Sequence, residues 1–76
     1  MIYERIKDLR YWKRLKQEEI AKELGMPQTT YSNYEIGKRG IPIEILSKLA
    51  DYHNTSVDYI LERTNEKKPY PPIDDD

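Results

Sequence analysis

Apolar residues recur at helical spacing along most of the chain and predict a series of short helices. Between residues 2 and 14, Ile2, Ile6 and Leu9 alternate with charged residues, as in an amphipathic helix with one buried face. The same periodicity predicts further helices over about residues 17–24, 28–36, 43–53 and 57–61. The chain is therefore expected to be all-α, with five helices.

A tight turn is predicted between the second and third of these helices. Gly25 is expected to end the second helix, because glycine adopts the left-handed conformation of a helix C-terminus without steric cost. Pro27 cannot extend that helix, and its fixed φ suits the start of the next one. Ala21 leaves room for two helices to cross closely. Residues 17–36 therefore have the pattern of a helix-turn-helix.

The third helix of this pattern presents short polar side chains on its outer face. Tyr31 and Tyr34 are expected to face the core, which leaves a set of polar residues outside: Gln28, Thr29, Ser32 and Asn33. These side chains both donate and accept hydrogen bonds, as reading base edges in a major groove requires. The competing interpretation is a helical bundle whose polar face is only solvated.

The remaining boundaries follow from local signals. Gly37 is expected to end the third helix, and Lys38 and Arg39 follow it in a basic loop. Asn54 is a plausible left-handed C-cap of the fourth helix, and Ser56 a plausible N-cap of the fifth. The fifth helix is apolar on most sides, so part of it is predicted to contact a second chain in a dimer through Val57, Tyr59 and Ile60.

The helical pattern stops at about Thr64. Residues 64–76 contain three prolines, have no helical period and finish in the acidic run Asp74–Asp76. We therefore expect one domain over residues 1–63 and an extended or disordered tail over residues 64–76.

Composition removes several classes of function. Seventy-six residues suffice for one domain, and the absence of cysteine excludes disulfides and thiolate metal sites. His53 is the only histidine and is expected to be a core or boundary residue rather than a metal ligand. The chain has no nucleophile–base set and no glycine-rich phosphate loop, so we expect neither an enzyme nor a bound cofactor. With no membrane-spanning run and no signal peptide, a soluble cytoplasmic protein is expected.

Charge is distributed unevenly along the chain. The net charge is −1, but residues 1–48 hold ten Lys/Arg against seven Asp/Glu, and residues 49–76 hold three against seven. The halves thus carry +3 and −4. The basic excess lies in the half with the predicted reading helix, and its small size predicts modest phosphate affinity for each monomer.

These features together resemble the Cro/phage-repressor type of helix-turn-helix domain, the XRE family. The block KQEEIAKELG…YSNYEIGKRGIP is similar to the family pattern without gaps, and the likeness covers about residues 3–62. The residues that carry it are Arg5, Leu9, Arg10, Leu15, Gln17, Ile20, Ala21, Leu24, Gly25, Tyr34, Glu35, Gly37, Pro42, Leu49, Ala50, Ser56, Asp58 and Leu61. The resemblance implies a compact five-helix, lambda-repressor-like fold.

The resemblance also implies roles for single residues. Gln17 is similar to a glutamine that bonds a phosphate and supports the next helix, while Gln28, Thr29, Ser32 and Asn33 occupy the base-reading face. Arg10 and Glu35 correspond to an internal ion pair. The predicted phosphate contacts are Lys13, Arg14, Lys16, Gln17, Lys38 and Arg39. One departure is Lys16, where the family usually has a Thr or Ser that caps the second helix.

The leading hypothesis is a sequence-specific regulator of transcription that binds double-stranded DNA, acting as a repressor and a homodimer on a near-palindromic site. The alternative is a protein-interaction module, such as an antitoxin or a partner that sequesters another regulator. In that case the tail and the fifth helix would be the contact surfaces.

Overall fold

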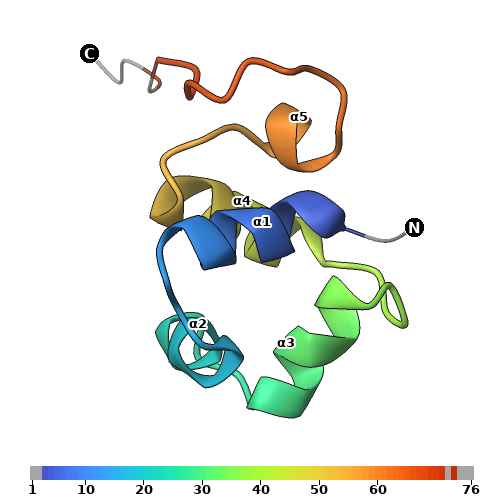
Figure 1. The fold of residues 1–76 in the computed structure, drawn as a ribbon. Coiled ribbons are helices and arrows are strands. Elements are labelled where there is room, and N and C mark those ends of the chain that lie inside the picture. Colours follow the sequence, from blue (N-terminus) through green and yellow to red (C-terminus); the bar gives the residue numbers. More distant parts are fainter. Residues whose placement is uncertain (1–2, 72, 74–76) are drawn as a thin grey trace.

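Five helices form the regular structure of the described residues (Figure 1). The computed structural model describes residues 3–71 and residue 73, and Ile2 and Asp74–Asp76 lie outside the described residues. The helices are α1 (Glu4–Trp12), α2 (Gln17–Glu23), α3 (Gln28–Glu35), α4 (Ile43–Tyr52) and α5 (Val57–Ile60). The described residues contain no strand, so the predicted all-α class is confirmed. None of these helices is long and apolar enough to cross a bilayer.

Each of these helices ends in the same left-handed turn. The residues with positive φ are Arg14, Gly25, Gly37, Asn54 and Glu62, one after each helix. The residue that follows each of them donates its backbone N–H to the carbonyl five residues earlier in the helix. The N–H of Leu15, for example, donates to the carbonyl of Arg10 at 3.1 Å. This is the Schellman motif, which supplies partners to carbonyls at the helix end. The predicted left-handed ends at Gly25 and Asn54 are confirmed.

Arg14 holds the left-handed conformation without the freedom of glycine. Its φ is 56° and its side chain is exposed, so replacement with glycine removes strain without removing packing. We expect Arg14→Gly to raise the free energy of unfolding by about 0.5–1 kcal/mol in urea titrations followed by Trp12 fluorescence. Gly25→Ala is the matched opposite: Gly25 has φ 71°, a Cβ added there would meet no atom within 4 Å, and the change should lower stability by a similar amount. Equal stability of Arg14→Gly and wild type would contradict this interpretation.

The core joins all five helices. α1 contacts both α3 and α5, α2 packs on α3, and α4 packs on α5. The side chains of Ile6, Ile20, Tyr31, Leu49 and Ile60 are the largest that are fully buried. In Figure 1, α2 and α3 lie at one end of the domain and α5 lies at the other, with α1 between them. The helix-turn-helix pair is thus held by its inner face and leaves its outer face free.

Two of the three predicted dimer contacts on α5 are buried within the single chain. Tyr59 and Ile60 are 9% and 1% exposed, because this short helix inserts its apolar side between α1 and α4 of the same chain. They complete the core of the monomer and offer almost no surface to a second chain. Only Val57 of the three predicted residues is half-buried rather than buried. The apolar excess of α5 therefore serves the chain's own core.

Residues 64–70, here called the strap, have no helix and lie along the domain. The guanidinium of Arg5 on α1 donates to the carbonyl of Thr64 and to Oδ1 of Asn65, the latter at 2.8 Å. Thr55 Oγ1 donates to the carbonyl of Lys67 at 2.6 Å. These residues therefore pack on the domain instead of trailing from residue 63.

His53 lies in the core, as expected, and has no polar partner there. It is 4% exposed, and neither ring nitrogen makes a hydrogen bond with the described residues. Burial lowers the pKa of His53 to about 4, and the charges of Lys13 and Lys67 add to this effect. The imidazole is therefore neutral in the folded chain at neutral pH.

Acid should weaken the fold through His53. The unfolded chain binds a proton at the ordinary pKa of 6.5 and the folded chain only near 4, so stability falls as pH falls through that window. The expected loss is roughly 3 kcal/mol. Urea titrations of His53→Leu between pH 7 and pH 4 should lack this acid-dependent loss of stability. A His53→Leu curve parallel to that of wild type would show that His53 titrates normally.

Candidate nucleic-acid interface

The helix-turn-helix is built by close packing of α2 on α3. Ala21 is 1% exposed at this crossing, and the N–H of Met26 donates to its carbonyl at 3.0 Å across the turn. Lys16 makes no side-chain cap, but its backbone N–H donates to Oε1 of Glu19 at 2.8 Å. This bond is half of a capping box and offsets part of the cap that a Thr or Ser would supply.

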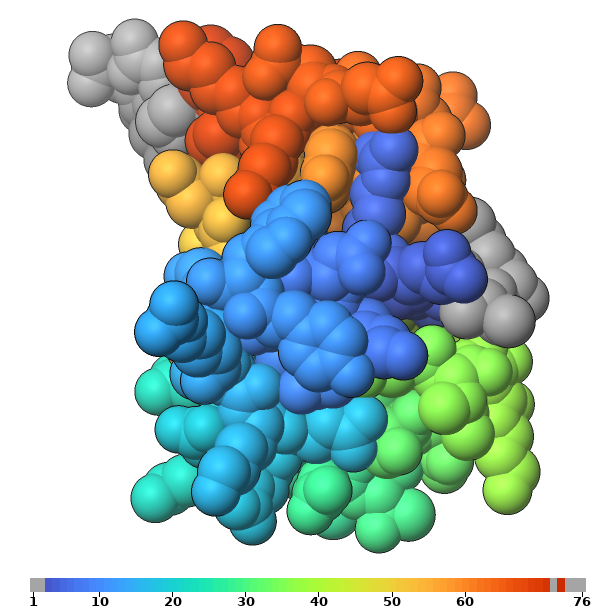
Figure 2. Space-filling view, viewed as in Figure 1, coloured from blue at the N-terminus to red at the C-terminus, as the bar shows by residue number. Residues whose placement is uncertain are grey.

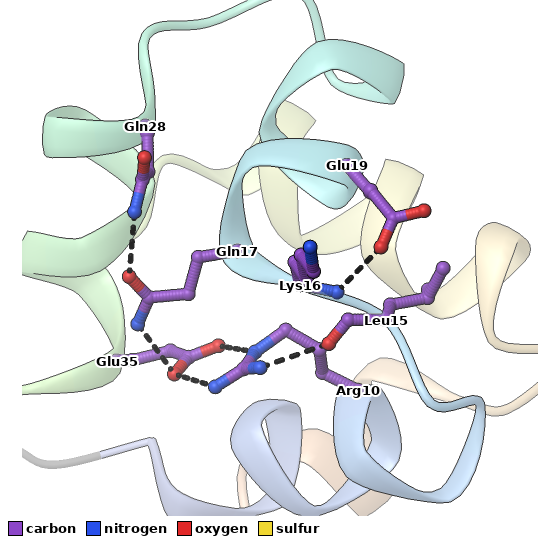
Figure 3. Close-up of polar contacts among 7 residues, drawn as sticks. All are labelled: Arg10, Leu15, Lys16, Gln17, Glu19, Gln28 and Glu35. Atoms are coloured by element: carbon purple, nitrogen blue, oxygen red, sulfur yellow. Dashed lines mark hydrogen bonds and ion pairs between the residues drawn. The ribbon is translucent and has the colours of Figure 1, made fainter.

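A buried ion pair fastens α1 to the end of α3. Arg10 donates from Nε to Oε2 of Glu35 at 2.7 Å and from Nη2 to Oε1 at 3.0 Å, as Figure 3 shows. Its Nη1 donates to the carbonyl of Leu15 at 2.9 Å. The two side chains are only 9% and 2% exposed. Burial alone raises the pKa of Glu35, but the bonds from Arg10 and Gln17 outweigh it, and the net pKa lies below its usual value.

The ion pair continues outward through two glutamines to the start of α3 (Figure 3). Gln17 Nε2 donates to Oε1 of Glu35 at 3.0 Å, which turns the Oε1 of Gln17 toward Gln28. Gln28 Nε2 lies 3.5 Å from that oxygen, at the long limit of a hydrogen bond. The buried charge pair thereby sets the orientation of Gln17, and Gln17 in turn steers the first side chain of α3.

The outer face of α3 is polar along its first two turns. Gln28 and Thr29 are exposed, and Ser32 and Asn33 are half-buried on the same helix. Ile36, which directly follows α3, is 60% exposed and is not among the predicted site residues. Its helical spacing from Thr29 and Ser32 could have signalled that it continues this face.

A groove of about 430 Å³ runs beside Gln17. It is lined by Gln17, Arg10 and Glu35 together with Glu4, Lys7, Tyr11 and Ile36. Lys7 and Tyr11 lie on α1 and are not among the predicted site residues. No sequence signal points to them, because only the fold brings the outer side of α1 next to Gln17.

The predicted phosphate contacts fall into two groups. Lys38 and Arg39 are exposed, and their backbone N–H groups donate to the carbonyl of Asn33, so this loop is folded against the end of α3. Lys16 is exposed directly before Gln17. Lys13 instead donates to the carbonyl of Tyr52 at 2.9 Å and lies over its ring.

Lys13 thus has a partner within the domain, and we do not carry it into the proposed phosphate contacts. Its ammonium is occupied at the C-terminal end of α4, where a cation also meets the negative end of the helix dipole. Arg14 is exposed in the turn after α1, and its phosphate contact stays a prediction. Among the predicted phosphate contacts, Lys16 directly precedes α2, and Lys38 and Arg39 follow α3 within four residues.

This chain belongs to the helix-turn-helix family: the family model with the description "Helix-turn-helix" matches residues 6–60. The match covers α1 from Ile6 onward and all of α2 to α5, so the family assignment and the fold agree.

Curated relatives carry the same signature. The chain is 33% identical over 69 residues to the uncharacterized HTH-type transcriptional regulator YobD of Bacillus subtilis, covering 91% of this chain and 62% of the relative. It is 35% identical over 71 residues to the HTH-type transcriptional regulator AnsR of the same organism, covering 93% and 61%. It is 35% identical over 57 residues to the cryptic phage CTXphi transcriptional repressor RstR of Vibrio cholerae, covering 75% and 51%. The chain thus spans about half to three fifths of the length of these relatives. No solved structure matches it.

Proposed function

We propose that this chain binds double-stranded DNA in a sequence-specific manner and regulates transcription, with α3 placed in the major groove. The observation that carries the proposal is the chain of contacts from the Arg10–Glu35 pair through Gln17 to Gln28. Three relatives named as transcriptional regulators or repressors support the same conclusion.

The geometry of Gln28 suits adenine. A glutamine amide has two N–H donors and one acceptor oxygen. Contact with Gln17 uses one N–H of Gln28 and leaves the other N–H and the Oε1 for a base. One donor and one acceptor side by side are what bidentate recognition of adenine N7 and N6 requires. Because the Gln17 contact is long, Gln28 can shift onto a base at little cost.

Phosphate contacts would fix the register of α3 on the duplex. Gln17 begins α2, where backbone N–H groups lack partners within the helix and favour anions. Lys16 precedes it, and Lys38 and Arg39 lie in the loop at the other end of α3. These residues flank the reading face at both ends, so they can meet the backbone on either side of a major groove.

We further propose that the chain acts as a dimer and as a repressor. A single reading helix of eight residues contacts few base pairs, and the basic excess of the domain is small. Two copies on a near-palindromic site would double both the number of base pairs contacted and the basic excess that faces the phosphates. Occupying a promoter would then suffice to repress.

Titration of a fluorescent duplex at several salt concentrations tests the phosphate contacts. We expect Lys38→Ala/Arg39→Ala to weaken binding to all sequences alike and to reduce the slope of log K against log salt by roughly 2, one for each lost contact. Lys13→Ala is the matched control, because Lys13 is bonded to Tyr52 in the domain, and its slope should equal that of wild type. An unchanged slope in the Lys38/Arg39 variant would contradict this placement of the loop.

A further inference from the structure

We propose that two copies of this chain associate by exchanging the strap, so that residues 64–70 of each copy occupy the groove between α1, α4 and α5 of the other. This inference rests on the proposed dimer and supplies its contact surface, since Tyr59 and Ile60 are committed to the core. The occupant of the surface is thus a segment of a second copy of the same chain.

The first half of the strap is held by one arginine. Arg5 donates from Nη1 to the carbonyl of Tyr59 at 2.8 Å and also to the carbonyl of Thr64. Its Nη2 donates to Oδ1 of Asn65 at 2.8 Å, and its guanidinium lies 4.2 Å from the centre of the Tyr59 ring. A single side chain of α1 therefore recognises α5 and the strap together.

The second half is held by contacts to three separate elements. Thr55, which is 4% exposed, donates to the carbonyl of Lys67 at 2.6 Å. The ammonium of Lys67 lies 4.2 Å from the ring centre of Trp12 at the end of α1. The hydroxyl of Tyr70 donates to Oδ2 of Asp58 at 2.6 Å. These contacts are specific in position, yet those of Lys67 and Tyr70 are at the surface, so strap release does not require the core to open.

A groove with matching chemistry lies beneath this half of the strap. A cavity of about 270 Å³ is lined by Pro69 and Tyr70 of the strap and by Ala50, Asp51, Val57 and Asp58 of the domain. The domain side supplies the carboxylate of Asp58, and the strap meets it with the hydroxyl of Tyr70. In an exchanged dimer, each groove would receive Pro69 and Tyr70 of the other copy in place of its own.

The hinge before the strap is strained. Glu62 has φ 61° and an exposed side chain, and it connects α5 to the strap. A left-handed glutamate is unfavourable, and extension of the hinge in an exchanged dimer would relieve it. The contacts of residues 64–70 would be kept, because the same groove receives the same residues. The bond from the N–H of Arg63 to the carbonyl of Asp58 would open with the hinge. Strained hinges favour such exchange.

Exchange would leave the reading helices free. Figures 1 and 2 show the strap along the end of the domain formed by α5, with α2 and α3 at the opposite end. Exchange would therefore leave α3 uncovered in both copies.

Substitution at Glu62 tests the proposal by sedimentation equilibrium without DNA. Glu62→Gly removes the strain from the closed monomer and so removes what favours exchange. Because each dimer forms from two such monomers, the effect counts twice, and we expect the dimer Kd to rise about 30-fold. Glu62→Val, which is least compatible with positive φ, should lower the Kd by at least ~10-fold. Arg14→Gly relieves the same conformation outside the hinge and should leave the Kd unchanged. Identical Kd values for the two Glu62 variants, or monomers only in wild type and Glu62→Val, would overturn strap exchange.

Cross-linking tests which groove the strap occupies. The chain has no cysteine, so Asp58→Cys and Tyr70→Cys can be placed on two separate copies and mixed. We expect a short bis-maleimide to join them into a covalent heterodimer, and a mixture of Asp58→Cys with Arg14→Cys to give none. Dimers without the cross-link would overturn exchange. Because neither experiment contains DNA, such a failure leaves the proposed DNA binding intact, whereas loss of DNA binding would leave these results standing.

Discussion

Replacing Arg10 with methionine should lower the free energy of unfolding by about 3–5 kcal/mol, because it leaves the Glu35 carboxylate buried without its counter-charge. The carboxylate makes two bonds to Arg10 and keeps only the one from Gln17 after the substitution. A domain of this size is stable by only about 5–10 kcal/mol. Urea titration of Arg10→Met should therefore find a domain close to its unfolding threshold at neutral pH.

Two controls separate the buried charge from lost packing. The double variant Arg10→Met/Glu35→Leu removes both charges and should recover most of the stability. The pH dependence should also reverse. In wild type the lowered pKa of Glu35 means that stability is present above about 4.5 and is lost as pH falls through the folded pKa. In Arg10→Met the carboxylate is destabilising, so acid should reduce the deficit relative to wild type. A double variant as unstable as the single one would show that packing, not charge, accounts for the loss.

Replacing Gln28 with alanine should weaken binding to the preferred DNA site by about 5- to 150-fold, the range for one bidentate base contact. Binding to random duplex should change little, because Gln28 is proposed to read a base and not a phosphate. Fluorescence titrations of both duplexes with wild type and Gln28→Ala measure the two effects. Equal weakening on both would contradict base reading.

Gln17→Ala distinguishes reading from support. Gln17 is not proposed to contact a base, but it orients Gln28 and draws its own orientation from Glu35. Its loss should lower affinity and also relax the preference at the position read by Gln28. A variant that loses affinity without any change in preference would assign Gln17 to phosphate binding alone.

The helix-turn-helix could be predicted from the sequence because its signals are local. Gly25 and Pro27 define the turn within three residues, and the predicted starts of α2 at Gln17 and of α3 at Gln28 agree with the structure. The Schellman ends also depend on neighbouring residues, which is why Asn54 and Gly37 are recognisable from the sequence. The Arg10–Glu35 pair came from the family resemblance, since spacing alone does not join two helices.

The strap and the burial of α5 could not be predicted in this way. Arg5 contacts Thr64 and Asn65 across 59 and 60 residues of sequence, and no local pattern records such a contact. The apolar character of Tyr59 and Ile60 indicates burial but not the surface that buries them. The partner of Lys13 could not be predicted for the same reason: its positive charge suits a phosphate, and only the fold shows its bond to the carbonyl of Tyr52.

Selection of bound sites from a random duplex library, at near-physiological salt, tests whether α3 reads DNA directly. Wild type and a Gln28→Ala/Asn33→Ala variant are compared after both are shown to be folded. We expect wild type to enrich a two-fold motif with half-sites about one helical turn apart, and the variant to lose or relax it. No enrichment by folded wild-type protein would contradict direct reading and would favour a protein partner in place of DNA.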